Sequence, residues 1–218
     1  MSSNCREFLD AILGWEGGRR FPWRGETDPY RIVVTEVLLI RTRRDAVARV
    51  YDRFFERFPT PCDLARADVA EILSVVGSLG LAKRAVYLKS LGEVLCREGV
   101  TPESLRKAKG VGPYVRSVLL LRLYGEGAVA VDRNGGRLLF RYLAGRDPGD
   151  KPELHPLVTE FVERCLNKLD ARARLRVTYA LMDLGFEVCR ARGPGCDVCP
   201  LKTSCRYPTS SRRCRSVC

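Results

Sequence analysis

Apolar residues recur at helical spacing along most of this 218-residue chain. Near the N-terminus, for example, Phe8, Leu9, Ile12 and Leu13 are spaced so that their side chains lie on one face of a helix. Convincing strand alternation is absent, because the short stretch AVAV before Asp132 is too small to form a sheet. The pattern therefore predicts an all-α protein of about ten helices.

Capping residues predict where several of these helices begin. Asp28 stands directly before Pro29, and this pair is typical of an N-cap followed by the first helical residue. Asp45 and Asp68 are expected to cap two later helices. A further helix is predicted over residues 152–169, and the Pro- and Gly-containing segment 145–153 is the best candidate for an interior loop.

The charge composition favours a polyanionic partner. The formal net charge is +12 with a pI of about 9.5, and 31 of the 38 basic residues are Arg. Such an excess of positive charge usually indicates nucleic acid, and Arg can bind a phosphate through two parallel hydrogen bonds. The alternative is that the charge serves solubility alone.

Composition also indicates where the protein works. No apolar run approaches the roughly 18 residues of a membrane span, and the N-terminal segment contains acidic residues, unlike a signal peptide. We therefore expect a cytoplasmic, nucleoid-associated protein with no membrane partner. The absence of Gln and the scarcity of Asn and Met are typical of thermophiles. Ten Cys are compatible with this expectation, because intracellular proteins of hyperthermophiles can be rich in disulfides.

Glu36 lies in the middle of the helix predicted to follow Asp28. Its neighbours three and four residues away are all apolar: Ile32, Val33, Leu39 and Ile40. A poorly solvated carboxyl has a raised pKa and can act as a general acid near neutral pH. The alternative is a buried structural Glu paired with an Arg such as Arg43.

The stretch KGVGPYVR, residues 109–116, separates two predicted helices. Gly110 and Gly112 allow a tight turn, and Pro113 suits the first position of the following helix. The N–H groups of such a turn and the positive end of the helix can bind a DNA phosphate without reading bases. A GxG turn on its own is weak evidence, since many helical pairs use one.

Asp132 precedes another predicted helix, and the commonest role of such an Asp is that of an N-cap. A helix N-terminus also stabilises an ionised carboxylate. Glu36 and Asp132 would then be two carboxyls whose environments favour opposite protonation states. That pattern divides the acid and anion roles in glycosidic cleavage.

Four cysteines occur near the C-terminus with the spacing C-x6-C-x2-C-x5-C: Cys189, Cys196, Cys199 and Cys205. Zinc sites typically use two closely spaced Cys or His pairs, whereas these unequal gaps suit an iron–sulfur cubane better. Zinc and disulfides remain the alternatives. The pairing of the other six cysteines is open, although the last two are near enough to pair: Cys5, Cys62, Cys96, Cys165, Cys214 and Cys218.

Four ordered motifs together resemble the helix–hairpin–helix (HhH-GPD) DNA glycosylase superfamily, which includes endonuclease III and MutY. They are RRFPWRGETDPYRIVVTEVLLIRT, KGVGPYVR, VDRN and the cysteine spacing. The resemblance covers nearly the whole chain and implies two helical domains that flank a DNA-binding cleft. It places a six-helix barrel with the hairpin at residues 28–133 and a 4Fe-4S cluster domain in residues 1–27 and 134–218.

The resemblance also implies catalytic roles. Asp132 would stabilise the oxocarbenium ion of the sugar or help to bring water to it, and Glu36 would assist departure of the base. Asn134 would orient the site beside Asp132. Tyr114 takes the position at which bifunctional members have a Lys that forms a Schiff base and nicks the strand. We therefore expect a monofunctional enzyme that leaves an abasic site.

For ligands, the resemblance implies a 4Fe-4S cluster held by the four clustered cysteines. It also implies that a monomer binds double-stranded DNA with a mismatched or damaged base. The expected DNA contacts come from the hairpin, from the turn after the first motif and from the cysteine stretch: Lys109, Gly110, Val111, Gly112, Arg41, Arg190, Arg192 and Lys202.

Two positions depart from the family pattern. Gly135 and Gly136 follow Asn134 where a β-branched apolar residue is usual, which is expected to loosen the start of this helix. Ala108 and Lys109 stand before the hairpin glycines where the family commonly has Leu-Pro, and this Lys would add a phosphate contact.

Two branches of the superfamily differ in the base that they remove. Ile40 and Arg41 replace the paired glutamines typical of MutY, and Leu81 follows Gly80 where MutY usually has Tyr. MutY also carries a Nudix-like domain, whereas 13 residues follow Cys205. We therefore favour the archaeal mismatch branch, which removes thymine or uracil opposite guanine. The alternatives are excision of adenine opposite 8-oxoguanine or guanine and, in another class, a non-catalytic iron–sulfur DNA-binding protein.

Overall fold

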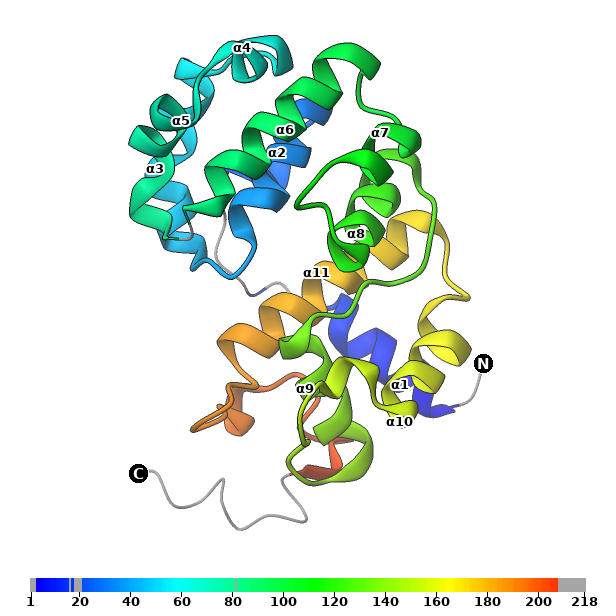
Figure 1. The fold of residues 1–218 in the computed structure, drawn as a ribbon. Coiled ribbons are helices and arrows are strands. Elements are labelled where there is room, and N and C mark those ends of the chain that lie inside the picture. Colours follow the sequence, from blue (N-terminus) through cyan, green and yellow to red (C-terminus); the bar gives the residue numbers. More distant parts are fainter. Residues whose placement is uncertain (1–2, 16, 18–20, 81, 208–218) are drawn as a thin grey trace. The chain divides into compact units, whose positions relative to one another are not determined.

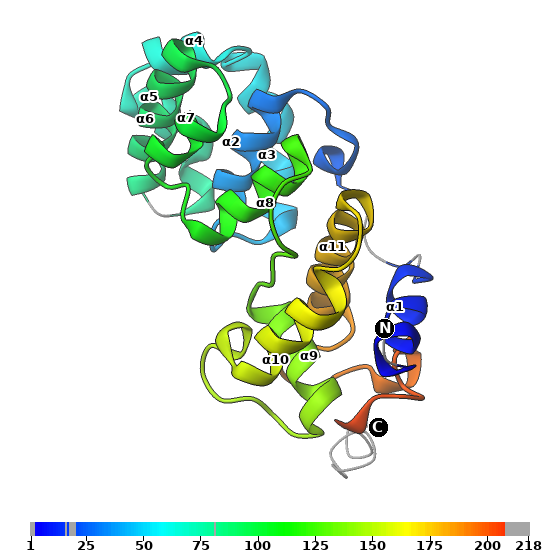
Figure 2. The same cartoon turned by 90° about the vertical axis from the view of Figure 1, so that its right-hand side faces the viewer.

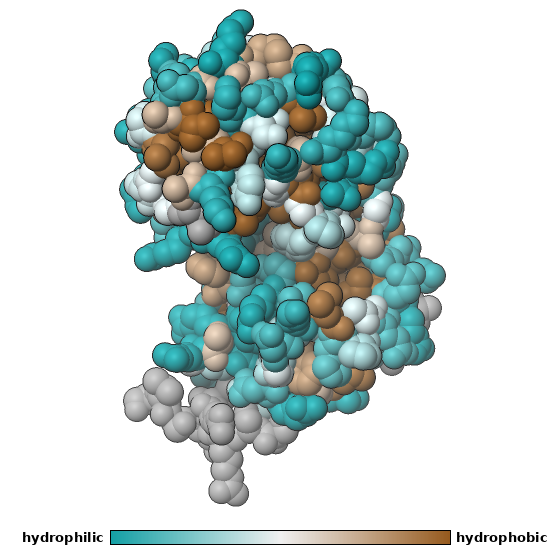
Figure 3. Space-filling view, in the orientation of Figure 1, coloured by the Kyte–Doolittle hydropathy of each residue, from teal (hydrophilic) through white to brown (hydrophobic). Residues whose placement is uncertain are grey.

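The structure is a computed structural model of the chain, and it describes residues 3–15, 17, 21–80 and 82–207. These residues form eleven α-helices, several short 3-10 helices and one π-helical turn, without any β-strand (Figure 1). The predicted all-α fold is confirmed. No helix in this described part is long and apolar enough to cross a membrane. The face of the molecule seen in Figure 3 is mainly hydrophilic.

The chain divides into two compact units. One comprises Arg20–Leu123, and the other combines Met1–Arg19 with Tyr124–Cys218. The limits of the first unit lie eight and ten residues before those of the domain predicted at 28–133, and the predicted domain limits remain a prediction.

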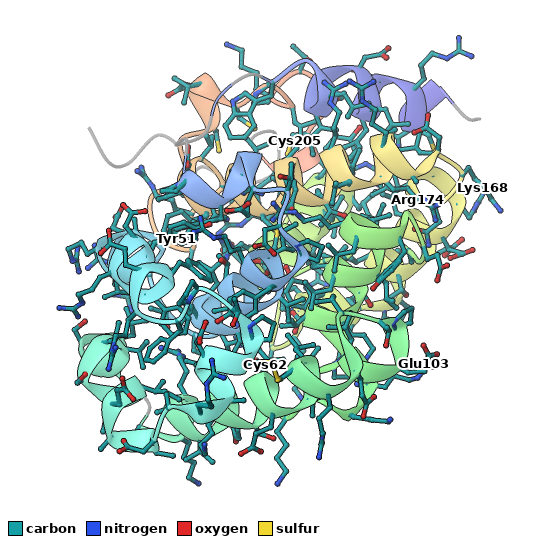
Figure 4. The ribbon with its side chains drawn as sticks, turned by 90° about the horizontal axis from the view of Figure 1, so that it is seen from above. Tyr51, Cys62, Glu103, Lys168, Arg174 and Cys205 are labelled. Carbon is teal, nitrogen blue, oxygen red and sulfur yellow. A yellow bond between two sulfur atoms is a disulfide. The ribbon has the colours of Figure 1, made fainter. Side chains whose placement is uncertain are left out.

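The unit of residues 20–123 contains a single core in which Phe54 is fully buried. Its helices are α2 (Pro29–Leu39), α3 (Arg44–Arg57), α4 (Pro61–Arg66), α5 (Val69–Val76), α6 (Lys83–Glu98), α7 (Pro102–Lys107) and α8 (Pro113–Tyr124). α4 and α6 pack so closely that a Cβ on Gly92 would lie 2.8 Å from Ala65 N. A disulfide between Cys62 and Cys96 crosslinks the same two helices (Figure 4).

The other unit brings the N-terminal helix into the core of the C-terminal half (Figure 2). Its helices are α1 (Ser3–Leu13), α9 (Arg133–Ala144), α10 (Pro156–Phe161) and α11 (Ala171–Glu187). Phe8 of α1 is fully buried in edge contacts with Tyr142 of α9 and Phe161 of α10. The disulfide between Cys5 and Cys165 crosslinks α1 to the π-helical turn that follows α10.

Two predicted N-caps are confirmed, because the side chains of Asp28 and Asp68 each accept a hydrogen bond from a backbone N–H in the first turn of the helix. The prediction for Asp45 is wrong. α3 already begins at Arg44, so Asp45 lies inside the first turn, where its charge interacts favourably with the helix dipole.

The prediction of one continuous helix over residues 152–169 is also wrong. A 3-10 turn at Pro152–Leu154 is followed by α10 and the π-helical turn. The physical reason is Pro156, which disfavours helical geometry in the preceding residue. His155 is accordingly extended (φ −68°, ψ 135°), and its Nδ1 accepts a hydrogen bond from a backbone N–H of α10.

Candidate active site

Glu36 lies near the C-terminal end of α2, a helix whose side chains are buried along most of its length. The residue itself is 6 % exposed. Burial raises the pKa of Glu36, while the positive charges of Arg122, Arg24 and Arg44 act in the opposite direction and do not cancel the rise. The burial of Glu36 confirms the expectation of a poorly solvated carboxyl on this face, and the charges that act on it come from these three arginines and not from Arg43, the partner expected in the alternative.

The backbone that leads into α2 is held by a side chain from α8. Arg122 Nη2 donates to Trp23 O at 2.7 Å and to Glu26 O at 2.9 Å. The positive charge of this guanidinium also lowers the pKa of Glu36, and its effect is the largest among the three arginines. Arg122 therefore both holds the start of α2 and acts on the buried carboxyl within it.

The predicted hairpin is the turn between α7 and α8. Gly110 has a φ of +89°, a region that favours glycine, and a Cβ there would lie 3.1 Å from Tyr87 Cβ. Val111 is buried in the core of this unit, whereas Lys109 and Gly112 are exposed. α8 begins directly after Gly112, and the N–H groups at the start of this helix therefore lie beside the exposed part of the hairpin. This geometry is suited to binding an anion such as phosphate.

Two further predicted residues lie in the same unit as Glu36 and the hairpin. Tyr114 is in the first turn of α8 and packs, partly buried, against the core. Arg41 lies in the turn after α2, where it is exposed and has a φ of +51°. This unit therefore contains a buried carboxyl at Glu36, a hairpin suited to binding phosphate and an exposed cation at Arg41.

Asp132 is the N-cap of α9, as predicted. Its Oδ1 accepts a hydrogen bond from Gly135 N at 2.7 Å, and its Oδ2 accepts one from Asn134 Nδ2 at 3.0 Å. Each carboxylate oxygen therefore has a donor, and the helix N-terminus favours negative charge at this position. The arrangement fixes a carboxylate in one orientation, and Asn134 lies beside Asp132 as the resemblance implies.

The two glycines after Asn134 have a packing role. Gly135 and Gly136 are buried inside α9, and a Cβ on Gly136 would lie 2.4 Å from Glu153 N. On α11, a Cβ on Gly185 would lie 2.5 Å from Asn134 O. The helix that begins after Asp132 is thus closely enclosed by its neighbours, and the loosening expected from these glycines stays a prediction.

Arg137 connects the Asp132 site with the cysteine stretch. Its Nη2 donates to Asn134 Oδ1 at 3.1 Å and to Gly185 O at 2.6 Å, and its Nε donates to Cys189 O at 2.9 Å. A continuous chain of hydrogen bonds therefore runs from the Asp132 carboxylate through Asn134 and Arg137 to the first of the clustered cysteines.

The four clustered cysteines are not in disulfides, and all of them line one small cavity of about 20 Å³. Arg141 is buried beside them, and its Nη1 lies 3.5 Å from Cys189 Sγ. Across the described residues, no three Cys, His, Asp or Glu side chains are grouped closely enough to hold a metal ion. Four partly buried thiols around one cavity nevertheless form the donor set that a 4Fe-4S cluster uses, and the cluster remains a prediction.

The family described as HhH-GPD superfamily base excision DNA repair protein matches residues 34–174. The chain belongs to this superfamily. The resemblance seen in the sequence motifs is thereby confirmed.

Three relatives of this superfamily member illustrate the range of similarity. Thymine-DNA glycosylase of Aeropyrum pernix is 34 % identical over 197 residues, which cover 88 % of each chain. Thymine/uracil-DNA glycosylase of Pyrobaculum aerophilum is 33 % identical over 204 residues, covering 89 % of this chain and 88 % of that protein. Adenine DNA glycosylase of Mycobacterium tuberculosis is 31 % identical over 198 residues, covering 87 % of this chain and 64 % of that protein.

Solved structures agree with the superfamily assignment. The structure of a thermostable thymine-DNA glycosylase has a TM-score of 0.79 and 29 % identity, covering 95 % of this chain and 98 % of that chain. A non-covalent endonuclease III–DNA complex has a TM-score of 0.76 and 22 % identity, covering 96 % and 98 %. The second likeness shows the fold alone.

The cations predicted on the cysteine stretch of this HhH-GPD protein are all exposed, and they differ in their contacts. Arg190 donates to Gly193 O through Nε and Nη2, and Lys202 Nζ donates to Asp197 O at 3.2 Å. Two of these cations therefore hold their own loop, and their contact with DNA remains a prediction, as does that of Arg192.

Some predicted positions lie outside the described residues. These are Leu81, which bears on the choice between the two branches of the superfamily, and the possible pair Cys214 and Cys218.

Three arginines that contact or act on the predicted site residues were not themselves predicted from the sequence. Arg137 and Arg141 lie four residues apart on α9, and this spacing could have indicated a common partner for both side chains. Arg122 left no such signal, because its acceptors Trp23 and Glu26 are 99 and 96 residues away in sequence.

Proposed function

We propose that this protein is a monofunctional DNA glycosylase that hydrolyses the N-glycosidic bond of thymine or uracil opposite guanine and leaves an abasic site. The observation that carries the proposal is the contrast between its two carboxyls. Glu36 is buried in an apolar helix, whereas Asp132 is held by two hydrogen bonds at a helix N-terminus. Such a contrast suits one acid and one anion in the same reaction.

Asp132 would act on the sugar. Departure of the base leaves positive charge on the anomeric carbon and ring oxygen, and an ionised carboxylate stabilises it. An opposite charge about 4 Å away is worth about 4 kcal/mol at an effective dielectric near 20, which corresponds to roughly three decades in rate. Hydrogen bonds from Gly135 N and Asn134 Nδ2 support this function by holding the carboxylate before the charge develops.

Glu36 would act on the leaving base. Because burial raises its pKa, the carboxyl retains a proton at higher pH than an ordinary Glu does. A proton donated to the base, or a hydrogen bond shared with it, makes the base a better leaving group.

Tyr114 supports the absence of strand cleavage. A phenol cannot form the Schiff base that a Lys at this position would form with the opened sugar. The proposed product is therefore an intact strand with an abasic site.

The choice of thymine or uracil is supported by two relatives that are named thymine or thymine/uracil glycosylases. The match with this chain covers 88 % of the length of each of them. The physical cost of the reaction agrees with it. Flipping a base out of the duplex costs least at a mismatch, so a base paired wrongly with guanine is the more accessible target.

The remaining parts of the proposal concern ligands. Cys189, Cys196, Cys199 and Cys205 would hold a 4Fe-4S cluster, which when bound would crosslink the C-terminal loop. Exposed cations of that loop and the hairpin would bind phosphates of double-stranded DNA that contains the mismatch. We further propose that the protein acts as a monomer, inside the cell, where its DNA substrate lies.

The proposal can be tested with duplexes that contain T·G, U·G, A·G or adenine opposite 8-oxoguanine, each incubated with excess protein and then treated with alkali. We expect cleavage of the T·G and U·G strands, and only after alkali. Cleavage confined to the adenine duplexes would support the adenine alternative, binding without cleavage would support the non-catalytic one, and nicking before alkali would contradict a monofunctional enzyme.

A further inference from the structure

Arg84 is a buried guanidinium on α6 that contacts two separate turns of its unit. Its Nη2 donates to Ile40 O at 2.5 Å and to Thr42 Oγ1 at 2.6 Å. Its Nη1 lies 3.4 Å from Leu79 O and 3.5 Å from Gly80 O. All four acceptors that the structure gives this side chain are neutral oxygens, and none belongs to a carboxylate.

The first of the two turns carries Arg41, which lies between the two residues that Arg84 contacts through Nη2. The φ of Arg41 is +51°, and only one other described non-glycine residue, Lys151, has a positive φ. A side chain other than glycine holds this conformation only where its surroundings determine it. Hydrogen bonds from Arg84 to the residues before and after Arg41 supply such surroundings, while the Arg41 side chain itself remains exposed.

The second turn is the 3-10 helix Gly77–Leu79 and the glycine that follows it. Gly80 has φ +71° and ψ −178°, a conformation essentially restricted to glycine, and its N–H donates to Gly77 O at 3.1 Å. Because Arg84 reaches both turns with one planar group, it holds the turn of residues 40–42 against that of residues 77–80.

Filling the space between the two turns does not by itself explain an arginine at this position. Burial lowers the pKa of Arg84, which reflects the cost of keeping a cation away from water. An apolar side chain of similar size could fill the space without that cost. What an apolar side chain lacks is the planar fork that donates to two turns at once.

Lys89 on the same helix offers a direct contrast. Its Nζ donates to Ala65 O and Ala67 O at 2.9 Å each, and it lies 3.7 Å from Glu93 Oε1. Lys89 therefore also holds a turn through two carbonyls, but it has an acidic partner, and the turn that it holds carries none of the residues expected to contact DNA.

We propose that Arg84 is a positioning residue for DNA binding, which fixes the backbone on both sides of Arg41 so that the exposed Arg41 side chain meets DNA in a single orientation. The inference rests on the proposed function only in taking DNA as the ligand of Arg41. It makes Arg84 act through Arg41 and not on DNA itself.

A double-mutant cycle on DNA affinity tests this role. Binding to a T·G duplex is measured by fluorescence anisotropy for the full-length protein, Arg41→Ala, Arg84→Met and the double variant, all carrying Asp132→Asn to suppress turnover. We expect each single change to weaken binding roughly tenfold. Adding Arg84→Met to Arg41→Ala should weaken binding by less than about twofold, because no Arg41 side chain remains to be positioned.

The controls separate positioning from loss of stability. Lys89→Met should leave binding within about twofold of the parent, since it removes comparable carbonyl contacts elsewhere on α6. If Arg84→Met does not fold, as judged by circular dichroism, Arg84→Lys replaces it in the cycle, because Lys keeps the charge and loses the fork. Equal losses from the Arg84 change with and without Arg41, no loss at all, or an equal loss in Lys89→Met would each overturn the proposal.

The double-mutant cycle still tests the role of Arg84 if the proposed function is wrong. A protein that excises neither thymine nor uracil but still shows non-additive binding would contradict the proposed function alone. Normal excision together with additive binding losses would contradict only the role of Arg84.

Discussion

α2 and α9 are each associated with one of the two carboxyls assigned to the reaction, and the two carboxyls are placed differently. α2 is buried along most of its length, and Glu36 lies within it, away from water. α9 is also largely buried, but Asp132 precedes its first turn, where two donors reach the carboxylate. The same chemical group, a carboxyl, is thus suited to act as an acid within α2 and as an anion at the start of α9.

The arginines around the two carboxyls extend this contrast. Around Glu36, arginine charges act at longer range and partly oppose the effect of burial on its pKa. Near Asp132, Arg137 contacts Asn134 directly and continues to Cys189. Asp132 is therefore linked to the cysteine stretch by a chain of hydrogen bonds, whereas the pKa of Glu36 is determined mainly by its burial.

The largest effect is expected when the anion is removed while its helix is kept. Asp132→Asn should reduce single-turnover excision of uracil opposite guanine by about a thousandfold, because Asn caps a helix as well as Asp does but carries no charge. Asp68→Asn is the matched control, since Asp68 caps α5 through the same kind of hydrogen bond, which its Oδ1 accepts from Glu71 N at 2.7 Å. Excision that survives in Asp132→Asn would show that the two carboxyls do not divide the roles as stated.

A smaller effect is expected from the link between α9 and the cysteine stretch. Arg137→Met should lower excision by roughly tenfold and, with the proposed cluster bound, increase the rate of loss of iron from the purified protein, as changes around a metal ligand commonly do. Iron content, visible absorbance and single-turnover rates measure both consequences. Arg174→Met is a suitable control, because Arg174 also donates to two backbone carbonyls of this unit, those of Gly125 and Gly127. If both variants lose activity alike, the hydrogen-bond chain has no specific role.

Much of this fold could be predicted from local patterns. Helical periodicity predicts the all-α class, and the Asp28–Pro29 pair predicts the start of α2 because capping depends on neighbouring residues only. Asp132 and the hairpin glycines were found for the same reason. The burial of Glu36 followed from its apolar neighbours on one helix face.

Contacts between distant parts of the chain could not be predicted in this way. The disulfide of Cys5 with Cys165 spans 160 residues, and Arg84 reaches Ile40 across 44. Sequence spacing carries no signal for such pairs, because tertiary packing brings them together. The packing role of Gly136 could not be predicted for the same reason, since it depends on the approach of Glu153 and not on helix propensity.

Glu36 is proposed to act as an acid and Asp132 as an anion, and the pH dependence of excision distinguishes these two roles. Single-turnover excision of uracil opposite guanine would be measured against pH for the parent protein and Glu36→Gln. Burial raises the pKa of Glu36 above its ordinary value of 4.5, so the required proton is present below the raised pKa and lost above it.

We therefore predict that the parent rate falls as pH rises through a break above 4.5. Glu36→Gln should be slower by about a hundredfold below that break and should lack it, because an amide does not titrate. The same break in both proteins would contradict the claim, since the titrating group would then lie elsewhere.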